Sequence, residues 1–109
     1  MITNEQIELL KLTIAQTIKP EQIVIFGSYS KGLQTEDSDL DLLVIVKDST
    51  ENRLQRTRTL RKSLWGIVAA PKDIMVYTEK EVNFWKDIEF SFISNILKEG
   101  RVIYEKSDD

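Results

Sequence analysis

The sequence contains neither cysteine nor histidine among its 109 residues. This absence excludes disulfide bonds, thiolate zinc sites and nucleophilic machinery built on a cysteine or on a serine–histidine pair. It also excludes general acid–base catalysis by an imidazole, the side chain that most often does this work near neutral pH. Any chemistry must therefore use carboxylates, hydroxyls, amines and bound ions.

Long hydrophobic runs are missing as well. The longest purely apolar run, Leu42 to Val46, is far too short to cross a bilayer. The amino-terminal segment carries Glu5, Glu8 and Lys11 among its apolar positions, which is not the pattern of an export signal. We therefore expect a cytoplasmic protein that does not contact the membrane.

The remaining composition is that of an ordinary globular domain. Hydrophobic residues make up 41% of the chain and charged residues 30%, with a net charge of −3. The length suits one hydrophobic core, so we expect a single domain over residues 1–105 and a frayed tail over residues 106–109.

Hydrophobic periodicity predicts an alternation of helices and strands. Thr3 and Gln6 form a candidate capping box for a helix that stops before Pro20. Ser49 or Thr50 is expected to cap a long helix that reaches about Ala69, with Pro71 behind it. The remaining predicted elements are strands at 22–26, 39–46, 72–78 and 101–104, a turn at 28–32, and one or two helices within 79–98.

The sequence predicts that several large apolar side chains lie in the core. The long helix should bury four of them, Leu54, Leu64, Ile67 and Val68. Four aromatic residues are most simply core residues too, namely Trp65, Trp85, Phe90 and Phe92.

Two aspartates open the strand predicted at 39–46. Asp39 and Asp41 point to the same face, with Cα atoms roughly 6.5 Å apart, because a strand rises about 3.3 Å per residue. A solvated strand face would explain an isolated pair. Two carboxylates held this way can also bind two divalent cations, which sit about 3.5–4 Å apart in phosphoryl-transfer sites. Carboxylate oxygens favour Mg²⁺ or Mn²⁺.

A third aspartate lies on the strand predicted at 72–78. Asp73 could complete the cage of one cation if this strand lies beside the strand of Asp39 and Asp41. A structural salt bridge between Asp73 and Lys72, or an arginine of the preceding helix, is the alternative.

A glycine–serine turn follows the strand predicted at 22–26. Gly27 allows the backbone to approach a ligand closely, Ser28 offers a hydroxyl and an N–H, and Lys31 can add a positive charge. These features suit phosphate binding. The alternatives are that Ser28 is only a turn residue and that Lys31 is only a solvated lysine.

Three segments, GSYSKG, SDLDLLV and KDIMVYT, together resemble the minimal nucleotidyltransferase branch of the polymerase β superfamily. The resemblance covers roughly residues 20–80. Gly27, Ser28, Asp39, Asp41 and Asp73 fall on the motif positions. A lysine at position 31 stands where arginine is commoner in the family. The resemblance implies an α+β fold with a small mixed sheet, helices packed on one face and the carboxylates exposed on the other.

The resemblance also implies an activity. By this resemblance, Asp39 and Asp41 bind two Mg²⁺ ions, and Asp73 completes the coordination of the ion that binds the acceptor oxygen. Ser28 holds the outer phosphates of ATP. AMP would pass to a protein hydroxyl, most often a tyrosine. A chain of this size resembles the antitoxin half of HEPN/MNT pairs, which modifies or masks a HEPN ribonuclease. The alternative is a binding module that neutralises its partner by occlusion, although the three intact aspartates argue against a decayed site.

A basic cluster stands on the long predicted helix. Its members are Arg53, Arg56, Arg58, Arg61 and Lys62. A solvated face is the simplest interpretation. Contact with a triphosphate, docking to an acidic partner and contact with nucleic acid are the alternatives, and the net charge of −3 disfavours nucleic acid.

Overall fold

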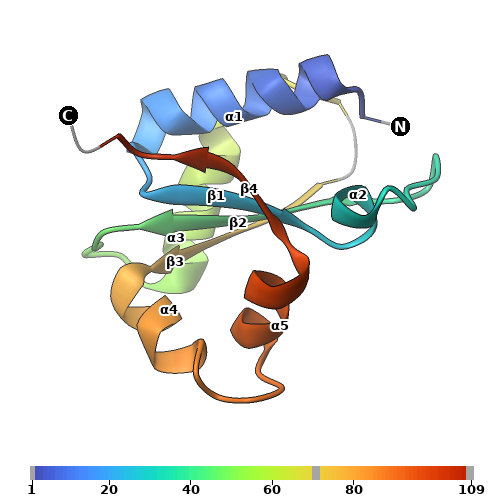
Figure 1. Ribbon diagram of the computed structural model, residues 1–109. Helices are drawn as coiled ribbons and strands as arrows, with labels where there is room; N and C mark the ends of the chain where they lie inside the picture. Colours follow the sequence, from blue (N-terminus) through green and yellow to red (C-terminus); the bar gives the residue numbers. More distant parts are fainter. Residues whose placement is uncertain (1, 70–71, 108–109) are drawn as a thin grey trace.

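The computed structural model describes residues 2–69 and 72–107, which form one mixed sheet with helices around it (Figure 1). The elements in chain order are α1 (Asn4–Ile18), β1 (Gln22–Phe26), α2 (Ser28–Lys31), β2 (Leu40–Val46), α3 (Arg53–Ser63), β3 (Lys72–Thr78), α4 (Glu79–Trp85), α5 (Phe92–Glu99) and β4 (Arg101–Glu105). In this part of the chain no helix has the length and apolar character that a membrane span requires.

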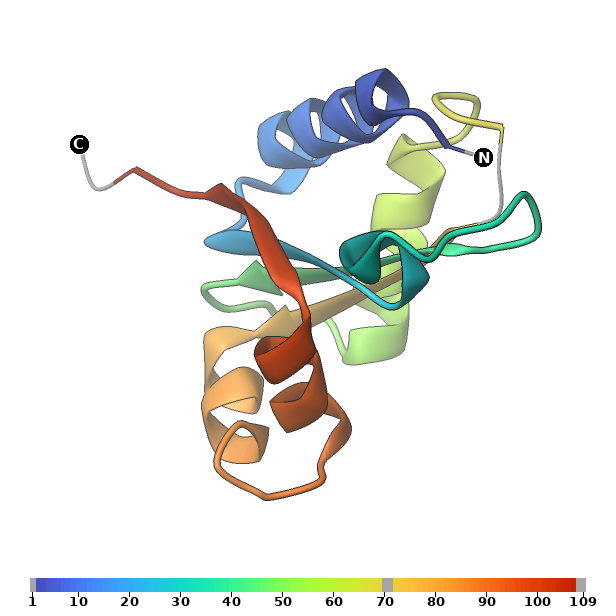
Figure 2. The same cartoon turned by 45° about the vertical axis from the view of Figure 1, so that its right-hand side comes forward.

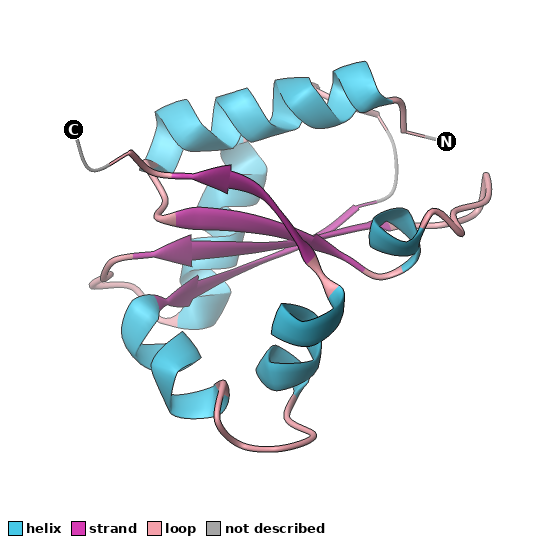
Figure 3. Cartoon of the chain, viewed as in Figure 1, coloured by secondary structure: helices cyan, strands magenta, loops and turns pink. Residues whose placement is uncertain are grey.

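The sheet has the strand order β3-β2-β1-β4 (Figure 3). β1 is antiparallel to both of its neighbours, β2 and β4, whereas β2 and β3 are parallel. Parallel neighbours need a crossover connection, and α3 supplies it. The predicted α+β class with a small mixed sheet is confirmed.

Most predicted boundaries agree with the structure. Thr3 and Gln6 form the expected capping box, in which the Thr3 Oγ1 accepts from the Gln6 N–H at 3.1 Å and the Gln6 Oε1 accepts from the Thr3 N–H at 2.9 Å. At the other end, the Lys106 N–H donates to the Glu21 carbonyl at 2.9 Å, directly beyond β4 and β1. The predicted roles of Pro71 and of tail residues 108–109 lie outside the described residues.

Two helix boundaries differ from the prediction. α3 begins after Asn52 rather than at Ser49 or Thr50, because the Asn52 Oδ1 accepts from the Gln55 N–H at 2.9 Å. It ends at Ser63 rather than near Ala69, and the turns that follow contain a left-handed glycine, Gly66. The segment 79–98 forms two helices, because Ser91 caps α5.

Both faces of the sheet carry helices, which corrects the expectation of helices on one face (Figure 2). One face packs Leu42 and Val44 against Leu10 of α1 and Leu60 of α3. The other face packs buried residues against α4 and α5; these are Val24, Leu43, Ile45, Tyr77, Val82, Ile93 and Ile96. The physical reason is that β2 is apolar on both faces beyond Asp41, so each face needs a cover.

Several residues assigned to the core are exposed. Trp65 is 89% exposed, Phe90 82%, Leu54 70% and Phe92 53%. Trp85 is also exposed, whereas Leu64 and Val68 are buried as predicted and Ile67 is partly buried. The apolar stripe of α3 faces the sheet through Leu60, and Leu54 lies outside that stripe. The α4–α5 hairpin extends past the sheet, so it buries only part of its apolar surface (Figure 2).

Arg56 joins α3, β3 and α4 from a buried position. Its guanidinium makes a forked ion pair with Glu81 at 2.7 and 3.0 Å and also donates to the Val76 carbonyl at 3.0 Å and the Glu51 carbonyl at 3.0 Å. The side-chain hydrogen bonds from Arg56 are the main reason that the pKa of Glu81 falls from 4.5 to about 2. This residue of the basic cluster therefore has a structural role.

We expect Glu81→Gln to lower the free energy of unfolding at neutral pH by about 1–3 kcal/mol, because the Arg56 guanidinium loses its anionic partner. The wild-type contribution is complete above pH 4.5, the ordinary pKa of a glutamate, and is lost as the pH falls toward about 2. The stability gap between the two proteins should therefore narrow across this range. Urea unfolding at several pH values measures the gap, and a gap independent of pH would contradict this role.

Candidate active site

The parallel register of β2 and β3 brings the predicted carboxylates together. Asp41 lies directly opposite Asp73, and on the other side it pairs with Phe26 of β1. Asp39 directly precedes β2. Asp41 is partly buried, whereas Asp39 and Asp73 are exposed. The carboxylates thus occupy the end of the sheet face where β2 and β3 begin.

The negative charge of Asp41 is disfavoured in this arrangement. Burial raises the pKa of the Asp41 carboxyl, and the negative charges of Asp73 and Asp39 raise that pKa further. A bound cation would relieve both the repulsion and the lost hydration. The site therefore favours a positively charged ligand.

Asp73 contacts a cation of the protein itself. The Arg61 Nη2 lies 3.4 Å from the Asp73 Oδ1, and both side chains are more than half exposed. The predicted alternative of a salt bridge to a helix arginine is thus present. Exposed ion pairs of this kind contribute little stability, so Asp73 can leave Arg61 for another cation at little cost.

The three carboxylates are not arranged as a ready-made metal cage. Within residues 2–69 and 72–107, no three acidic side chains converge closely enough to hold an ion. Their chemistry nevertheless fits Mg²⁺ or Mn²⁺, because these ions prefer carboxylate oxygens and Asp41 lies in a cluster of negative charge. Binding would require the carboxylate of Asp73 to leave Arg61 and turn toward Asp41.

Gly27 allows the turn after β1 to lie against Asp41. Its backbone has φ +73° and ψ −152°, a conformation that essentially only glycine adopts. A Cβ at this position would collide with the Asp41 carboxylate and would lie 3.3 Å from its Cγ. Position 27 therefore requires a glycine for two reasons, the conformation of the turn and the closeness of Asp41 on β2.

Ser28 opens the short helix α2 with its side chain half-buried. Its hydroxyl makes no hydrogen bond with any residue that the structure describes. The first N–H groups of a helix also lack acceptors within that helix. The start of α2 therefore offers donors beside the carboxylates, as a phosphate-binding turn requires.

Other contacts fix the position of α2. The Ser30 hydroxyl donates to the Gly27 carbonyl at 2.9 Å, and the buried Tyr29 accepts from the Ile2 N–H at 2.9 Å. Lys31, a predicted phosphate contact, places its Nζ 3.1 Å from the Glu99 Oε2 of α5. Its ammonium therefore links α2 to α5.

Sequence reasoning missed two contributors to the site. Phe26 pairs with Asp41 across the sheet and makes an edge-to-face contact with Phe92, with ring centroids 5.9 Å apart. The position of Phe26, just before the glycine turn, was the available signal. Arg61 gave no local signal, because only the packing of α3 on β3 brings it to Asp73.

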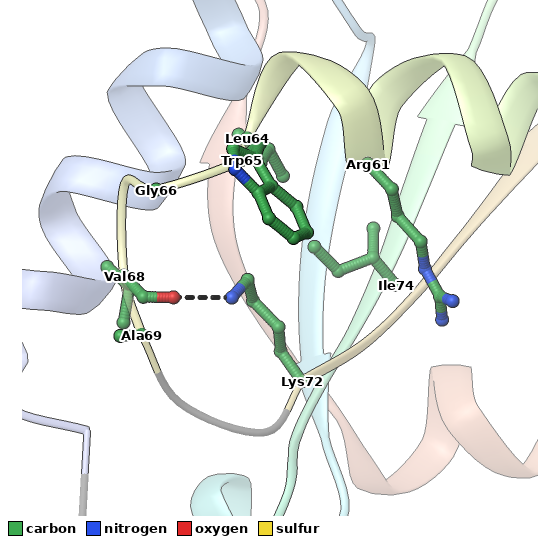
Figure 4. A pocket seen from close by; sticks show the side chains of 8 residues that line it. All are labelled: Arg61, Leu64, Trp65, Gly66, Val68, Ala69, Lys72 and Ile74. Atoms are coloured by element: carbon green, nitrogen blue, oxygen red, sulfur yellow. Dashed lines mark hydrogen bonds between the residues drawn. The ribbon is translucent and has the colours of Figure 1, made fainter.

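Two hollows border the strand of Asp73. One has a volume of about 530 Å³ and lies on the α3 side, where Trp65 stands beside Ile74 and the Lys72 Nζ donates to the Val68 carbonyl at 2.6 Å (Figure 4). The other has a volume of about 560 Å³ and includes Asp73 itself. Arg61 lines both.

Comparison with known proteins identifies the family of the chain. A family model described as a nucleotidyltransferase domain matches residues 7–104. The chain belongs to the nucleotidyltransferase domain family. This confirms the predicted resemblance, and the protein is a nucleotidyltransferase enzyme.

Two relatives of this nucleotidyltransferase come from Methanocaldococcus jannaschii, and both are provisionally named protein adenylyltransferases. One is 37% identical over 102 residues, which span 93% of each chain. The other is 30% identical over 97 residues, which span 79% of this chain and 59% of the relative.

Solved structures share the fold of this nucleotidyltransferase. A provisionally named nucleotidyltransferase from Sulfolobus solfataricus is 21% identical, with a TM-score of 0.58 over 93% of this chain and 84% of that chain. A toxin–antitoxin structure with AMP-PNP is also 21% identical, with a TM-score of 0.58 over 96% of this chain and 76% of that chain. At this identity the likeness establishes the fold.

We expect Gly27→Ala to be markedly more destabilising than Gly32→Ala. Both glycines have positive φ, +73° and +69°, but Gly32 has a left-handed helical conformation with open space around it. Gly32→Ala should cost about 1 kcal/mol, and Gly27→Ala about 2–4 kcal/mol, because it adds a Cβ against the Asp41 carboxylate. Urea unfolding of the two variants gives the comparison. Equal losses would mean that the contact between Gly27 and Asp41 does not constrain the fold.

Proposed function

We propose that this nucleotidyltransferase uses Mg²⁺ and ATP to attach AMP to a tyrosine hydroxyl of a partner protein, a HEPN ribonuclease toxin that it thereby neutralises. The observation that carries the proposal is the strand register that sets Asp41 opposite Asp73, beside the turn of Gly27 and Ser28. That register provides carboxylates for cations and donors for phosphate in one place.

The relatives support the choice of nucleotide and acceptor. Both curated relatives are provisionally named protein adenylyltransferases, which favours AMP as the transferred group and a protein as the acceptor. The structural neighbour that carries AMP-PNP, an ATP analogue, is a toxin–antitoxin assembly. This supports ATP as the substrate and a toxin as the partner.

The residues divide the work by their position. Asp39 and Asp41 would hold the two Mg²⁺ ions, and Asp73 would complete the coordination of the ion on the acceptor side after releasing Arg61. When bound, the ions neutralise the polyphosphate and acidify the acceptor hydroxyl. Ser28 and the N–H groups of its turn hold the outer phosphates.

AMP transfer forms one phosphorus–oxygen bond and breaks another. The acceptor oxygen forms a bond to the α-phosphorus of ATP, and the bond from that phosphorus to the oxygen bridging the β-phosphate breaks. Pyrophosphate leaves, and the proton of the acceptor hydroxyl passes to the Asp73 carboxylate or to solvent. The product is a phosphodiester between the acceptor side chain and the ribose of AMP.

We expect Asp39→Asn and Asp41→Asn each to reduce AMP transfer by at least about 10²-fold, because each removes a charge that holds the cations. Both variants should stay folded, and Asp41→Asn should be at least as stable as the wild type, because it removes a repelled and partly buried charge. Asp37→Asn is the matched control, since Asp37 is exposed in the preceding loop. Mass spectrometry of the HEPN partner after incubation with ATP and Mg²⁺ counts the AMP units gained.

Normal transfer by the Asp41→Asn variant would contradict the assignment. If the HEPN partner stays unmodified and is inhibited equally well by wild type and variant, the protein acts by occlusion instead.

We expect Ser28→Ala to weaken Mg²⁺·ATP binding by about 3- to 30-fold, a smaller loss than that of the aspartate variants. The hydroxyl supplies one hydrogen bond to phosphate, whereas the N–H groups of the same turn remain. Isothermal titration with Mg²⁺·ATP measures the affinity of each variant. A complete loss of binding at unchanged stability would give Ser28 a different role.

A further inference from the structure

A groove follows the outer edge of β3, which we call the edge groove. It has a volume of about 560 Å³ and lies between α3 and the start of α5. The residues of the edge groove used below are Arg53, Leu54, Arg61, Asp73, Met75, Tyr77 and Phe92. β3 is the outermost strand on this side, and no strand in the described part of the chain pairs with its outer edge. The edge groove is therefore open to a second molecule.

The edge groove is continuous with the active site through Asp73. That carboxylate lines the groove and also lies opposite Asp41 in the sheet. Arg61, which holds Asp73, is a further wall residue. A chain lying in the groove thus reaches the carboxylate on the acceptor side of the site.

Two arginines line the edge groove, Arg61, which pairs with Asp73, and Arg53. The Arg53 guanidinium stacks over the Tyr77 ring, 4.9 Å from its centroid, and donates to the Tyr77 hydroxyl at 2.9 Å. Across residues 2–69 and 72–107, Arg53 forms no ion pair with a carboxylate. Arg56 on the same helix differs, because Glu81 neutralises it. The groove is consequently suited to an acidic occupant.

Exposed apolar groups complete the edge groove. Leu54 is 70% exposed and Phe92 53%, and the half-buried Met75 of β3 lines the groove with them. Aromatic and arginine side chains around an apolar centre are typical of protein–protein interfaces. The acidic Asp73 at one end and the net charge of −3 disfavour a nucleic-acid backbone. The occupant that fits is a protein segment.

We propose that the edge groove binds the acceptor segment of the partner protein, an acidic stretch whose aromatic hydroxyl is directed toward Asp73. The inference rests on the proposed function and adds the surface and the chemistry by which the acceptor is chosen. Acidic side chains of the segment pair with Arg53, and its aromatic ring packs against Phe92 and Met75. The groove volume of about 560 Å³ accommodates such side chains.

The test uses a fluorescein-labelled peptide with one tyrosine flanked on each side by three aspartates. Fluorescence anisotropy without nucleotide measures binding to the full chain, so the result is independent of catalysis. The acidic peptide should bind at least about tenfold more tightly than the same peptide with lysines in place of aspartates, and its affinity should fall with added salt.

Matched variants locate the binding. Arg53→Glu should weaken peptide binding at least about tenfold, whereas Arg58→Glu makes the same charge change on α3 outside the groove and should weaken it less than about threefold. Leu54→Ala should also weaken binding, and Leu12→Ala, on the exposed side of α1, should not. Equal effects of Arg53→Glu and Arg58→Glu would overturn the proposal.

A second measurement separates this inference from the proposed function. The peptide and the HEPN partner are each incubated with the nucleotidyltransferase, ATP and Mg²⁺. Mass spectrometry then measures whether either acceptor has gained AMP. Groove-dependent peptide binding without AMP transfer to either acceptor supports the groove and overturns the proposed function. Transfer to the HEPN partner that Arg53→Glu leaves unchanged overturns the groove. Tighter binding of a single-stranded RNA of equal charge, or a dimer that Arg53→Glu dissociates, also overturns it.

Discussion

The parallel pairing of β2 with β3 is the constraint on which the rest of the structure depends. It sets Asp41 opposite Asp73 and makes α3 the connection between the two strands. The Arg56 guanidinium then joins α3 to β3 and α4 by its hydrogen bond to the Val76 carbonyl and its ion pair with Glu81. A shift of one residue in this register would move Asp73 to the opposite face of the sheet, because side chains alternate along a strand.

A partly buried acidic group lowers stability, and the packing of the surrounding apolar residues offsets that loss. The raised pKa of Asp41 shows that both burial and its acidic neighbours disfavour its charge. Directly beyond it, β2 continues as a buried apolar strand covered on both faces. The hydrophobic core thus stabilises a strand that begins in a cluster of carboxylates. Gly27 permits the turn to approach the same carboxylate, which no other residue type would allow.

Exposed apolar side chains lie beside the candidate site. Phe92 touches Phe26 next to Asp41, yet more than half of its side chain is exposed. Leu54 and the α4–α5 hairpin add further exposed apolar side chains. Leu54 and Phe92 line the same groove as Asp73.

Local sequence patterns determined the elements and indicated the candidate site residues. Strand periodicity predicted one face for Asp39 and Asp41, of which Asp41 lies in β2 and Asp39 directly precedes it. The capping box at Thr3 fixed the start of α1. The glycine–serine turn and the strand of Asp73 were also evident, because turns and alternation depend on neighbouring residues. The comparisons confirm the family that these motifs indicated.

Only the tertiary structure decided which residues meet across the sheet and which surfaces stay uncovered. The pairing of Arg61 with Asp73, the burial of Arg56 and the exposure of Trp65 and Phe90 each depend on how α3 and the α4–α5 hairpin pack. A periodic pattern specifies that a helix has an apolar side, but not how much of that side a neighbouring element covers. That coverage depends on contacts between distant segments, whose pairing no local pattern records.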